Sequence, residues 1–450
     1  MTSKGSVLVI GSGAAGSSAA RALADKGWDV TIAEHGKVGG TCLWRGCIPK
    51  KALYTAARAV REARRAEQFG VMCAKVEVDW QGVLAWKWHA QETYAGDQRG
   101  SFAARGIRII DGSARFISPD EVIVADETLR PDHIVLATGS VPVMPDVAGI
   151  DRADDSDGAL RFLSVPAALA IVGGGFIALE LAAIFSSFGS KVTVIERGSR
   201  ILGMLDSELA EVARRRLESY GAEFITDATF SGIAGEPGTQ GVRLRLSNGS
   251  TRVVEAERVV VAAGRQAQVE GLDLAAAGIE IDTKGRLVVD EHLRTSNERV
   301  WVCGDVAGGM MQTPVASMQG RTVASAIDTG TLQTADVSAV PVTCFTSPQL
   351  ASVGLSQQQA TDQGLTVRVG RVDASSIGAA VVDDERDFFA KFVISAENDR
   401  ILGAQVAGPT ASDVIYAAAV AIKAGMTAEA LQSVIGVHPS YAEAEFYAAW

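Results

Sequence analysis

The sequence predicts an α/β fold with two domains built on parallel β-sheets and a smaller α+β domain at the C-terminus. Two separated stretches, residues 6–34 and 170–196, share the same order of strand, glycine-rich turn, helix, second strand and final glutamate. Short apolar runs at 340–345 and 388–394 predict an antiparallel sheet, and residues 411–424 predict a flanking helix. The length of 450 residues agrees with this division, because single cores rarely grow to that size.

Composition narrows the class of protein. The net charge is −11 and no long basic run occurs, so nucleic acid is not expected as a partner. No apolar stretch reaches about 18 residues, and the N-terminus lacks a signal-peptide pattern, so we expect no membrane span. Five cysteines do not make a disulfide scaffold. We therefore expect a cytoplasmic protein, in which a close cysteine pair is more often catalytic than structural.

The first repeated stretch has the residues that a dinucleotide site requires. Gly11, Gly13 and Gly16 form G-x-G-x-x-G directly after an apolar run. The first glycine permits a tight turn, the second lets a pyrophosphate approach the backbone, and the third lets the helix pack on the strand. Glu34 ends the second strand, where a carboxylate can accept hydrogen bonds from a ribose. The predicted strand, helix and second strand span residues 6–10, 19–26 and 30–33.

The second stretch repeats this order. Gly173, Gly175 and Ala178 form G-x-G-x-x-A, a helix is expected to about Phe188, and Glu196 ends the next strand. Two such units predict two bound dinucleotides and two Rossmann-like domains, and hydride transfer needs both a donor and an acceptor.

The end of the second unit favours NAD(H) over NADP(H). The Glu196 carboxylate would repel a ribose 2′-phosphate. Arg197 and Arg200 follow closely, and either could reach that phosphate instead of pointing to solvent. We favour NADH, and the alternative stays open.

Two cysteines, Cys42 and Cys47, lie between the two units in the segment GGTCLWRGCIPKK. Their spacing does not fit a zinc knuckle, and we predict no metal site. In an ideal helix, residues five apart lie roughly 8–9 Å apart between Cα atoms, whereas a disulfide needs less than about 7 Å. If the two cysteines bond, the helix start must therefore be distorted around Cys42. Spacing alone leaves a redox pair and two unrelated thiols as equal alternatives.

The same segment resembles the redox motif of the pyridine nucleotide-disulfide oxidoreductases, the family of dihydrolipoamide dehydrogenase, glutathione reductase and mercuric reductase. The family pattern is GGTC, four residues, GC, Ile or Val, and Pro, which this chain matches through Pro49. Further motifs of the family occur in family order at residues 137–140, 263–265, 303–305, 313–316, 345–348 and 438–443.

The resemblance implies a division of the chain into three domains. An FAD-binding domain would span residues 1–145 and continue at 265–330. An NAD(P)-binding domain would span 146–264, and a dimerisation domain 331–450.

The resemblance also implies an electron relay. NAD(P)H would dock where Phe176 occupies the position of the usual gating tyrosine, and electrons would pass through FAD to a disulfide between Cys42 and Cys47. Cys47 would lie against the flavin, and Cys42 would attack the substrate disulfide. His438 would act as acid and base, oriented by Glu443. Since the family draws this histidine from the other subunit, we expect a homodimer with shared active sites.

The cofactor-binding residues implied by the resemblance fall into two sets. A lysine after the second cysteine, Lys50 or Lys51, should lie beside the flavin and pair with Glu180. The FAD set is Gly11, Gly13, Gly16, Glu34, Thr41, Lys50, Lys51, Thr138, Gly139 and Asp305. The NAD(P) set is Gly173, Gly175, Phe176, Ala178, Glu180, Glu196 and Gly264.

Some departures from the family leave the substrate open. Trp44 and Arg45 stand where small or neutral residues are usual, and Trp44 could face substrate or simply pack. Gly436 replaces a second histidine that is common in dihydrolipoamide dehydrogenases, which leans toward glutathione reductase, whereas Glu196 leans back toward NADH-using enzymes. The substrate would be a small-molecule or carrier-bound disulfide. The alternatives are a flavin oxidase or transhydrogenase with idle thiols, and a docking subunit of a 2-oxoacid dehydrogenase assembly.

Overall fold

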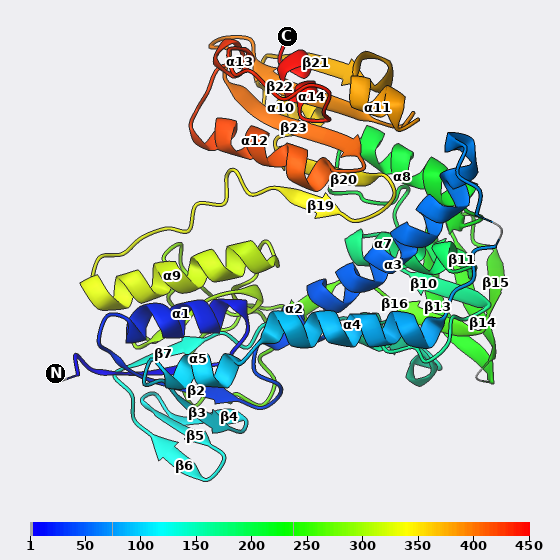
Figure 1. Ribbon diagram of the computed structural model, residues 1–450. Coiled ribbons are helices and arrows are strands. Elements are labelled where there is room, and N and C mark those ends of the chain that lie inside the picture. The colour runs from blue at the N-terminus through cyan, green and yellow to red at the C-terminus, as the bar shows by residue number, and fades with distance from the viewer. Residues whose placement is uncertain (1–2, 74, 237) are drawn as a thin grey trace. The chain divides into compact units, whose positions relative to one another are not determined.

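The computed structural model describes residues 3–73, 75–236 and 238–450, and Figure 1 shows their path. The described chain forms two compact units. The first comprises Met1–Ala52, Leu84–Val143 and Arg265–Asp336, and the second comprises Leu53–Val83, Met144–Gly264 and Val337–Trp450. Two of the boundaries fall inside helices, α3 (Cys47–Arg65) and α4 (Trp80–Ala95).

The first unit is built on a five-stranded parallel sheet with the order β18-β7-β1-β2-β3. These strands are β1 (Ser6–Ile10), β2 (Asp29–Glu34), β3 (Arg108–Asp111), β7 (His133–Leu136) and β18 (Val300–Val302). Valine, leucine and isoleucine on both faces of β1 are buried, as a central parallel strand requires.

Helix α1 (Ala14–Ala24) lies beside α9 (Thr313–Thr329), as Figure 1 shows. Gly320 of α9 permits this close approach, because a Cβ added there would lie 2.3 Å from the carbonyl oxygen of Ala15. The middle of α9 therefore packs against the first turn of α1.

Smaller elements complete the first unit. Three antiparallel strands form one sheet and two more strands form a two-stranded ribbon. Three short helices also belong to this unit. These elements are β4 (Ala114–Ser118), β5 (Glu121–Val124), β6 (Glu127–Leu129), β8 (Ser140–Pro142), β17 (Arg265–Ala267), α2 (Gly40–Trp44), α5 (Gln98–Ala103) and η3 (Asp305–Ala307).

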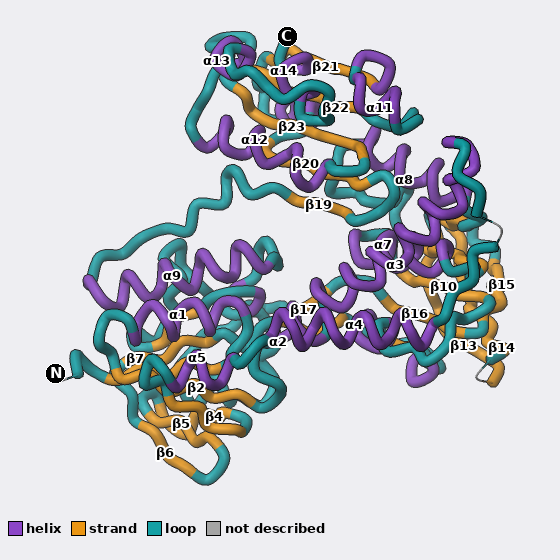
Figure 2. Tube along the Cα trace, in the orientation of Figure 1, coloured by secondary structure: helices purple, strands orange, loops and turns teal. Residues whose placement is uncertain are grey.

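The second unit contains a similar parallel sheet with the order β12-β11-β10-β16-β9 and an antiparallel sheet β13-β14-β15. Figure 2 shows β10 and β16 of the first sheet near the strands of the second. The strands are β9 (Asp154–Asp155), β10 (Ala168–Val172), β11 (Lys191–Ile195), β12 (Glu223–Ile225), β13 (Ala228–Glu236), β14 (Thr239–Leu246), β15 (Thr251–Ala256) and β16 (Arg258–Val261). The helices of this region are η1 (Ala66–Phe69), η2 (Ile150–Arg152), α6 (Ser156–Ala159), α7 (Phe176–Ser187) and α8 (Ser207–Ser219).

The C-terminal part of the second unit is an antiparallel sheet with the order β19-β20-β23-β22-β21, and α12 packs on β20 and β23. The strands are β19 (Val342–Cys344), β20 (Gln349–Gly354), β21 (Val367–Asp373), β22 (Phe389–Ser395) and β23 (Ile401–Gly408). The helices are α10 (Gln357–Asp362), η4 (Ala374–Ser376), α11 (Gly378–Val382), α12 (Ala411–Lys423), α13 (Ala428–Gln432) and α14 (Glu443–Ala448).

A buried charged cluster joins this sheet to α8. Lys391 of β22 is 3% exposed, and its ammonium group donates to Asp206 at 2.7 Å and to Glu208 at 2.6 Å. Asp206 is also the N-cap of α8, where it accepts from the backbone amide of Glu208 at 3.0 Å. A buried ammonium needs such partners, because an unpaired charge in the interior is very costly.

The predicted fold class is confirmed, and most predicted elements are found. The first predicted strand matches β1, the sheet and helix expected near the C-terminus are present, and α7 ends one residue before Phe188. Helix α1 begins at Ala14, whereas the sequence predicted its start at Ala19. The difference arises because the glycine loop closes directly into the helix, so that Gly16 lies inside its first turn.

Among the described residues, no helix is both long and apolar enough to cross a membrane.

One buried carboxyl group should make the stability of the fold depend on pH. Burial of Glu445 in α14 raises its pKa to about 8, although its carboxyl group accepts a hydrogen bond from the Ala418 amide at 3.1 Å. Because the folded-state pKa lies above the unfolded value, stability is full below about pH 4.5 and falls as pH rises through about 8. A shift of this size corresponds to at most about 5 kcal/mol.

We therefore expect Glu445→Gln, which keeps the acceptor but cannot ionise, to raise the thermal midpoint at pH 9 and leave it unchanged at pH 4.5. Parallel melting curves from pH 4.5 to 9 measure this difference. An equal gain at both pH values would contradict it.

Candidate active site

The two glycine loops have the same backbone geometry. Gly11 and Gly173 have φ angles of 103° and 115°, in the region that favours glycine. A Cβ at Gly11 would lie 2.4 Å from the carbonyl oxygen of Ala137, and one at Gly173 would lie 2.3 Å from that of Ala262. Each glycine therefore lets its loop press against the strand next to it in the sheet.

The helices after these loops offer open amide groups. The N-caps of α1 and α7 are Gly13 and Gly175, and neither position has a side-chain cap. A Cβ at Gly13 would approach only the Cα of Gly40, at 3.9 Å, and one at Gly175 would meet no atom within 4 Å. The first amides of each helix thus face space suited to a pyrophosphate. Both loops fit a dinucleotide.

The third small residue of each motif serves packing. A Cβ at Gly16 would lie 2.0 Å from the carbonyl oxygen of Gly11, so only glycine fits there. In the second loop, Ala178 is fully buried at the corresponding place. The loops differ here by one methyl group, as their sequences predict.

The two glutamates at the strand ends are held alike. Glu34 accepts from the Ser12 amide at 2.9 Å, the Ser12 hydroxyl at 2.6 Å and the Gly36 amide at 2.8 Å. Glu196 accepts from the amides of Gly174 and Gly198, both at 2.6 Å. Each carboxylate is thereby fixed beside its glycine loop, where a ribose would lie.

The arginines near Glu196 are not arranged alike. The guanidinium group of Arg200 donates to the carbonyl oxygens of Leu205 at 3.0 Å and Gly203 at 2.9 Å. Arg197 is exposed. The guanidinium group of Arg200 is thus directed to backbone carbonyls.

The redox segment leaves its helix between the two cysteines. Helix α2 ends at Trp44, Arg45 has φ −138°, and α3 begins at Cys47. With the two thiols not joined in a disulfide, the chain is therefore broken between the cysteines. The distortion around Cys42 that the sequence predicts for a bonded pair stays a prediction. Gly40 brings this segment to the first glycine loop, because its φ is 69° and a Cβ there would lie 2.6 Å from the Cα of Gly13.

The two cysteine thiols interact without forming a disulfide. A hydrogen bond between their side chains, together with burial, raises the pKa of Cys42 above its ordinary range, although Thr313 acts in the opposite direction. The sulfur of Cys47 lies 3.5 Å from the hydroxyl oxygen of Thr313, the first residue of α9. Thr41 lies on α2, and its carbonyl accepts from the Arg45 amide at 2.8 Å. The geometry brings both sulfurs together beside the α9 start.

A polar cluster forms where the chain leaves and re-enters the first unit. Asp305 accepts from the Ser140 hydroxyl at 2.6 Å, and Arg265 donates to the same oxygen at 2.8 Å. Thr138 donates to the Gln268 carbonyl at 2.6 Å, and Gly139 has a φ of 78°. The predicted Asp305, Thr138 and Gly139 therefore lie near one another in the fold.

The start of α7 is supported by strand β19 and the residue after it. Glu180 is 1% exposed and accepts from the Phe345 amide at 2.9 Å. The Cys344 thiol lies 3.9 Å from the Phe176 carbonyl oxygen, to which it donates. Phe176 and Glu180 thus share a support, and Gly264, with φ 124°, follows β16 in the same unit.

The C-terminal histidine pairs with the predicted glutamate. The Nδ1 atom of His438 lies 2.7 Å from Glu443 Oε1, and the Ser440 amide donates to Glu443 Oε2 at 2.9 Å. These two hydrogen bonds lower the pKa of Glu443. The His438 side chain is 75% exposed, so its other nitrogen is open to a partner.

The remaining predicted residues are placed as follows. Lys50 and Lys51 lie in the first turn of α3 and are half-buried.

Among the described residues, no group of three or more histidine, cysteine or acidic side chains is close enough to hold a metal ion.

Three residues of this region carry no role in the sequence analysis. Ser12 fixes Glu34, Thr313 contacts Cys47, and Ser140 joins Asp305 to Arg265. Ser140 and Thr313 lie within family motifs, which was the one sequence signal for them, whereas Ser12 is the variable residue of a glycine motif.

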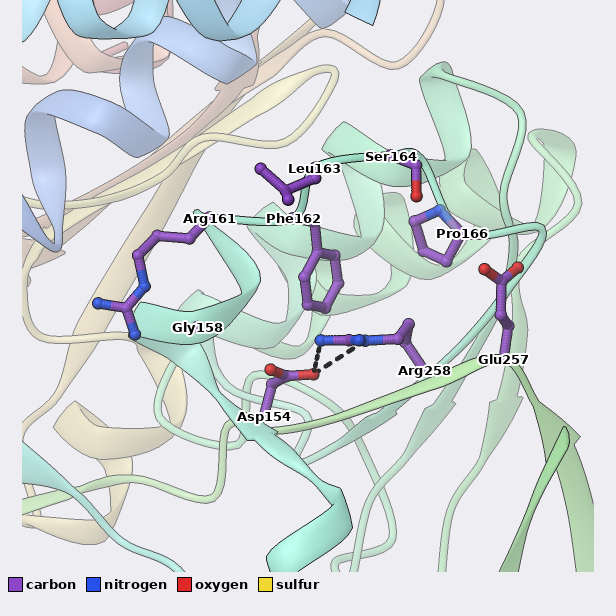
Figure 3. Close-up of a pocket in the computed structure, with 9 residues that line it drawn as sticks. All are labelled: Asp154, Gly158, Arg161, Phe162, Leu163, Ser164, Pro166, Glu257 and Arg258. Carbon is purple, nitrogen blue, oxygen red and sulfur yellow. Dashed lines mark hydrogen bonds and ion pairs between the residues drawn. The ribbon is translucent and has the colours of Figure 1, made fainter. Parts of the chain in front are cut away.

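A cavity of about 340 Å³ lies elsewhere in the second unit (Figure 3). Arg258 donates to Asp154 at 2.7 Å and lies 4.6 Å from the centre of the Phe162 ring. Pro166 precedes β10, and Arg258 begins β16. The cavity thus adjoins the amino-terminal ends of these strands, whereas dinucleotides bind at carboxyl ends. Its lining is Asp154, Gly158, Arg161, Phe162, Leu163, Ser164, Pro166, Glu257 and Arg258.

Comparison with known proteins agrees with this geometry. Residues 5–320 match the model of the pyridine nucleotide-disulphide oxidoreductases, and residues 340–448 match the dimerisation domain of that family. A dihydrolipoyl dehydrogenase of Geobacillus stearothermophilus is 35% identical over 448 residues, covering 98% of this chain and 95% of the relative. One from Halobacterium salinarum is 36% identical over 459 residues, with the same coverage.

A solved structure is also similar over the whole chain. The HOCl-induced flavoprotein disulfide reductase RclA from Escherichia coli has a TM-score of 0.88 and 28% identity, and the match covers 98% of each chain. With two dinucleotide loops and a contacting cysteine pair, the chain belongs to the pyridine nucleotide-disulphide oxidoreductase family and is an FAD-dependent NAD(P)H:disulfide oxidoreductase.

Proposed function

We propose that this enzyme exchanges electrons between NADH and a small-molecule or carrier-bound disulfide through Cys42 and Cys47. The single observation that carries the proposal is the contact between the two thiols at a break between helices. FAD supplies the electron-pair chemistry between nicotinamide and cysteines when it is bound. FAD would be held by the first glycine loop, by Glu34 and by the polar cluster around Thr138 and Asp305. The second loop would hold the nicotinamide nucleotide.

Cys42 is the proposed attacking thiol. Its thiolate attacks one sulfur of the substrate disulfide, forming a mixed disulfide and releasing the other sulfur as a thiolate. Cys47 then attacks the Cys42 sulfur, which closes the Cys42–Cys47 bond and releases the second substrate thiol. The substrate gains two electrons and two protons, and the pair loses them. Because the pKa of Cys42 is raised, its proton needs a base.

His438 is the proposed base. Donation from Nδ1 to Glu443 leaves Nε2 as the acceptor that takes the Cys42 proton and returns it to the leaving thiolate. The carboxylate also stabilises the imidazolium that forms, and its lowered pKa keeps it ionised.

A homodimer is proposed to complete the site. The loop before His438 is apolar and exposed, with Ile435 97% and Val437 75% exposed. On the outer face of α12, Tyr416 is 67% and Val420 50% exposed. Apolar patches of this kind are typical of surfaces that another chain covers, and this part of the chain matches the family's dimerisation domain. A second copy would bring His438 to the partner's cysteines.

NADH is the proposed nucleotide, because Glu196 is fixed at the strand end and Arg200 is engaged by backbone carbonyls. A lipoyl disulfide is the first substrate to test, since the dihydrolipoyl dehydrogenases above are about a third identical to this chain. The domain bounds expected from the sequence are part of the same proposal, with an FAD domain at 1–145 and 265–330, an NAD(P) domain at 146–264 and a dimerisation domain at 331–450. We also propose a cytoplasmic location, because a reducing compartment suits a thiol pair.

Replacing Cys42 with serine should separate the proposed relay from a flavin oxidase with idle thiols. We expect Cys42→Ser to abolish reduction of lipoamide and glutathione disulfide by NADH, because no attacking sulfur remains. Reduction of an artificial acceptor such as ferricyanide should continue, since it needs only bound FAD. Steady-state assays with both acceptor types measure the two activities, and retained disulfide reduction would refute the assignment.

The proton-transfer pair predicts a second result. We expect His438→Gln to lower kcat for disulfide substrates by about 100-fold or more, since general acid–base catalysis contributes that much. Glu443→Gln should lower it less and shift the pH profile, because the imidazolium loses its carboxylate. Ferricyanide reduction should be unchanged in both variants. Wild-type pH profiles in either variant would contradict the proposed pair.

The nucleotide preference rests on Glu196. We expect kcat/KM for NADH to exceed that for NADPH at least about tenfold, and Glu196→Ser to narrow the ratio by improving use of NADPH. Arg197→Ala is the matched control and should leave the ratio near its wild-type value. Equal use of the two nucleotides by the wild-type enzyme would overturn the preference.

A further inference from the structure

A buried glutamine holds the chain at the break between the two redox cysteines. The Nε2 atom of Gln91, on helix α4, donates to the carbonyl oxygens of Leu43 and Trp44, both at 3.1 Å. Its side chain is almost fully buried, with 1% exposed. Leu43 and Trp44 are the last two residues of α2 and lie between Cys42 and Cys47 in the chain.

These two carbonyls have a specific need for a donor. The last four carbonyls of a helix have no partner within it, and a buried carbonyl without a donor is costly. In a continuous helix, the amides of residues 47 and 48 would bind them. Here the chain turns at Arg45, and Gln91 supplies the missing donor.

The orientation of the glutamine amide follows from the same two bonds. Gln91 Oε1 is buried and has no hydrogen-bond partner among the residues that the structure describes. The two bonds given by Nε2 are therefore the interactions that orient this amide, and they lead only to the redox segment.

Trp44 is held at a second point. Its indole Nε1 donates to the Val38 carbonyl at 2.8 Å, and the Lys37 ammonium lies 4.5 Å from the centre of its ring. The same ammonium lies 5.8 Å from the ring of Trp88, which is one turn of α4 before Gln91. Trp44 thus fastens the end of α2 from its side chain, while Gln91 fastens it from the backbone.

We propose that Gln91 is a positioning residue that keeps the helix broken between Cys42 and Cys47 and so holds the two sulfurs within bonding reach. This inference rests on the redox role proposed for the pair. A continuous helix would place the two Cα atoms roughly 8–9 Å apart, too far for a disulfide. By satisfying the carbonyls that the break exposes, Gln91 stabilises the arrangement in which the sulfurs meet.

The consequence is a more stable disulfide. In exchange with dithiothreitol, the reagent gives up two electrons and two protons as its sulfurs join, and the Cys42–Cys47 bond is cleaved to two thiols. Loss of the Gln91 bonds disfavours the closed pair, so the equilibrium should move toward thiols by about tenfold. A tenfold change in this two-electron equilibrium equals about 30 mV.

The test compares holoenzymes in graded ratios of reduced and oxidised dithiothreitol. After acid quenching and alkylation, mass spectrometry measures the fraction of Cys42–Cys47 disulfide. We expect Gln91→Met, which keeps the length but not the N–H groups, to need a roughly tenfold more oxidising ratio at half conversion. Trp44→Phe, which loses the bond to Val38 and leaves a smaller ring beside Lys37, should shift it in the same direction by less.

The matched control is Gln81→Met on the same helix, where the amide donates to the Leu163 carbonyl at 3.0 Å and does not contact the redox segment. It should titrate as the wild type does. If Gln91→Met binds no FAD, then Gln91→Asn, which is too short to reach both carbonyls, serves instead and should give a smaller shift. An unchanged titration in a folded Gln91 variant would overturn the inference. A wild-type pair that forms no reversible disulfide would overturn the proposed function itself.

Discussion

The proximity of two sulfurs is the constraint on which the chemistry of this molecule depends, and an uninterrupted helix would not permit it. The chain meets the constraint by ending α2 at Trp44 and starting α3 at Cys47. Two features support the break. Gly40 lets the segment press against the first glycine loop, and Gln91 binds the carbonyls that the break leaves open. The redox pair is thereby set beside the loop that would carry a flavin nucleotide.

The two glycine loops have similar sequences and similar backbone conformations. In each loop, a glycine with positive φ lies against the neighbouring strand, an uncapped helix begins, and a glutamate at the next strand end accepts two backbone amides. The loops differ in individual side chains. Ser12 adds its hydroxyl to Glu34, whereas glycine occupies the equivalent position beside Glu196.

The sequence was informative where a function depends on local spacing. The fold class, both glycine loops, their glutamates and the cysteine pair all lie in short motifs whose geometry follows from a strand, a turn and a helix. It was less informative where partners come from distant parts of the chain. Gln91 binds carbonyls of the redox segment that lie 48 and 47 residues earlier in the chain, and Thr313 contacts Cys47 across 266 residues. The early start of α1 was not predicted, because a glycine such as Gly16 usually indicates a loop. Only the structure shows that Gly16 packs against Gly11 within the first turn of the helix.

The buried ammonium group of Lys391 has a consequence for how this sequence can vary. Its two carboxylate partners come from α8, almost two hundred positions earlier in the chain. Removing the lysine alone would leave the buried Asp206 carboxylate without its cation, whereas the more exposed Glu208 would keep its ion pair with Arg371. Removing Asp206 would weaken the compensation of the buried ammonium. Substitutions of Lys391 and Asp206 should therefore arise together across related sequences, and a replacement at position 206 must still cap α8.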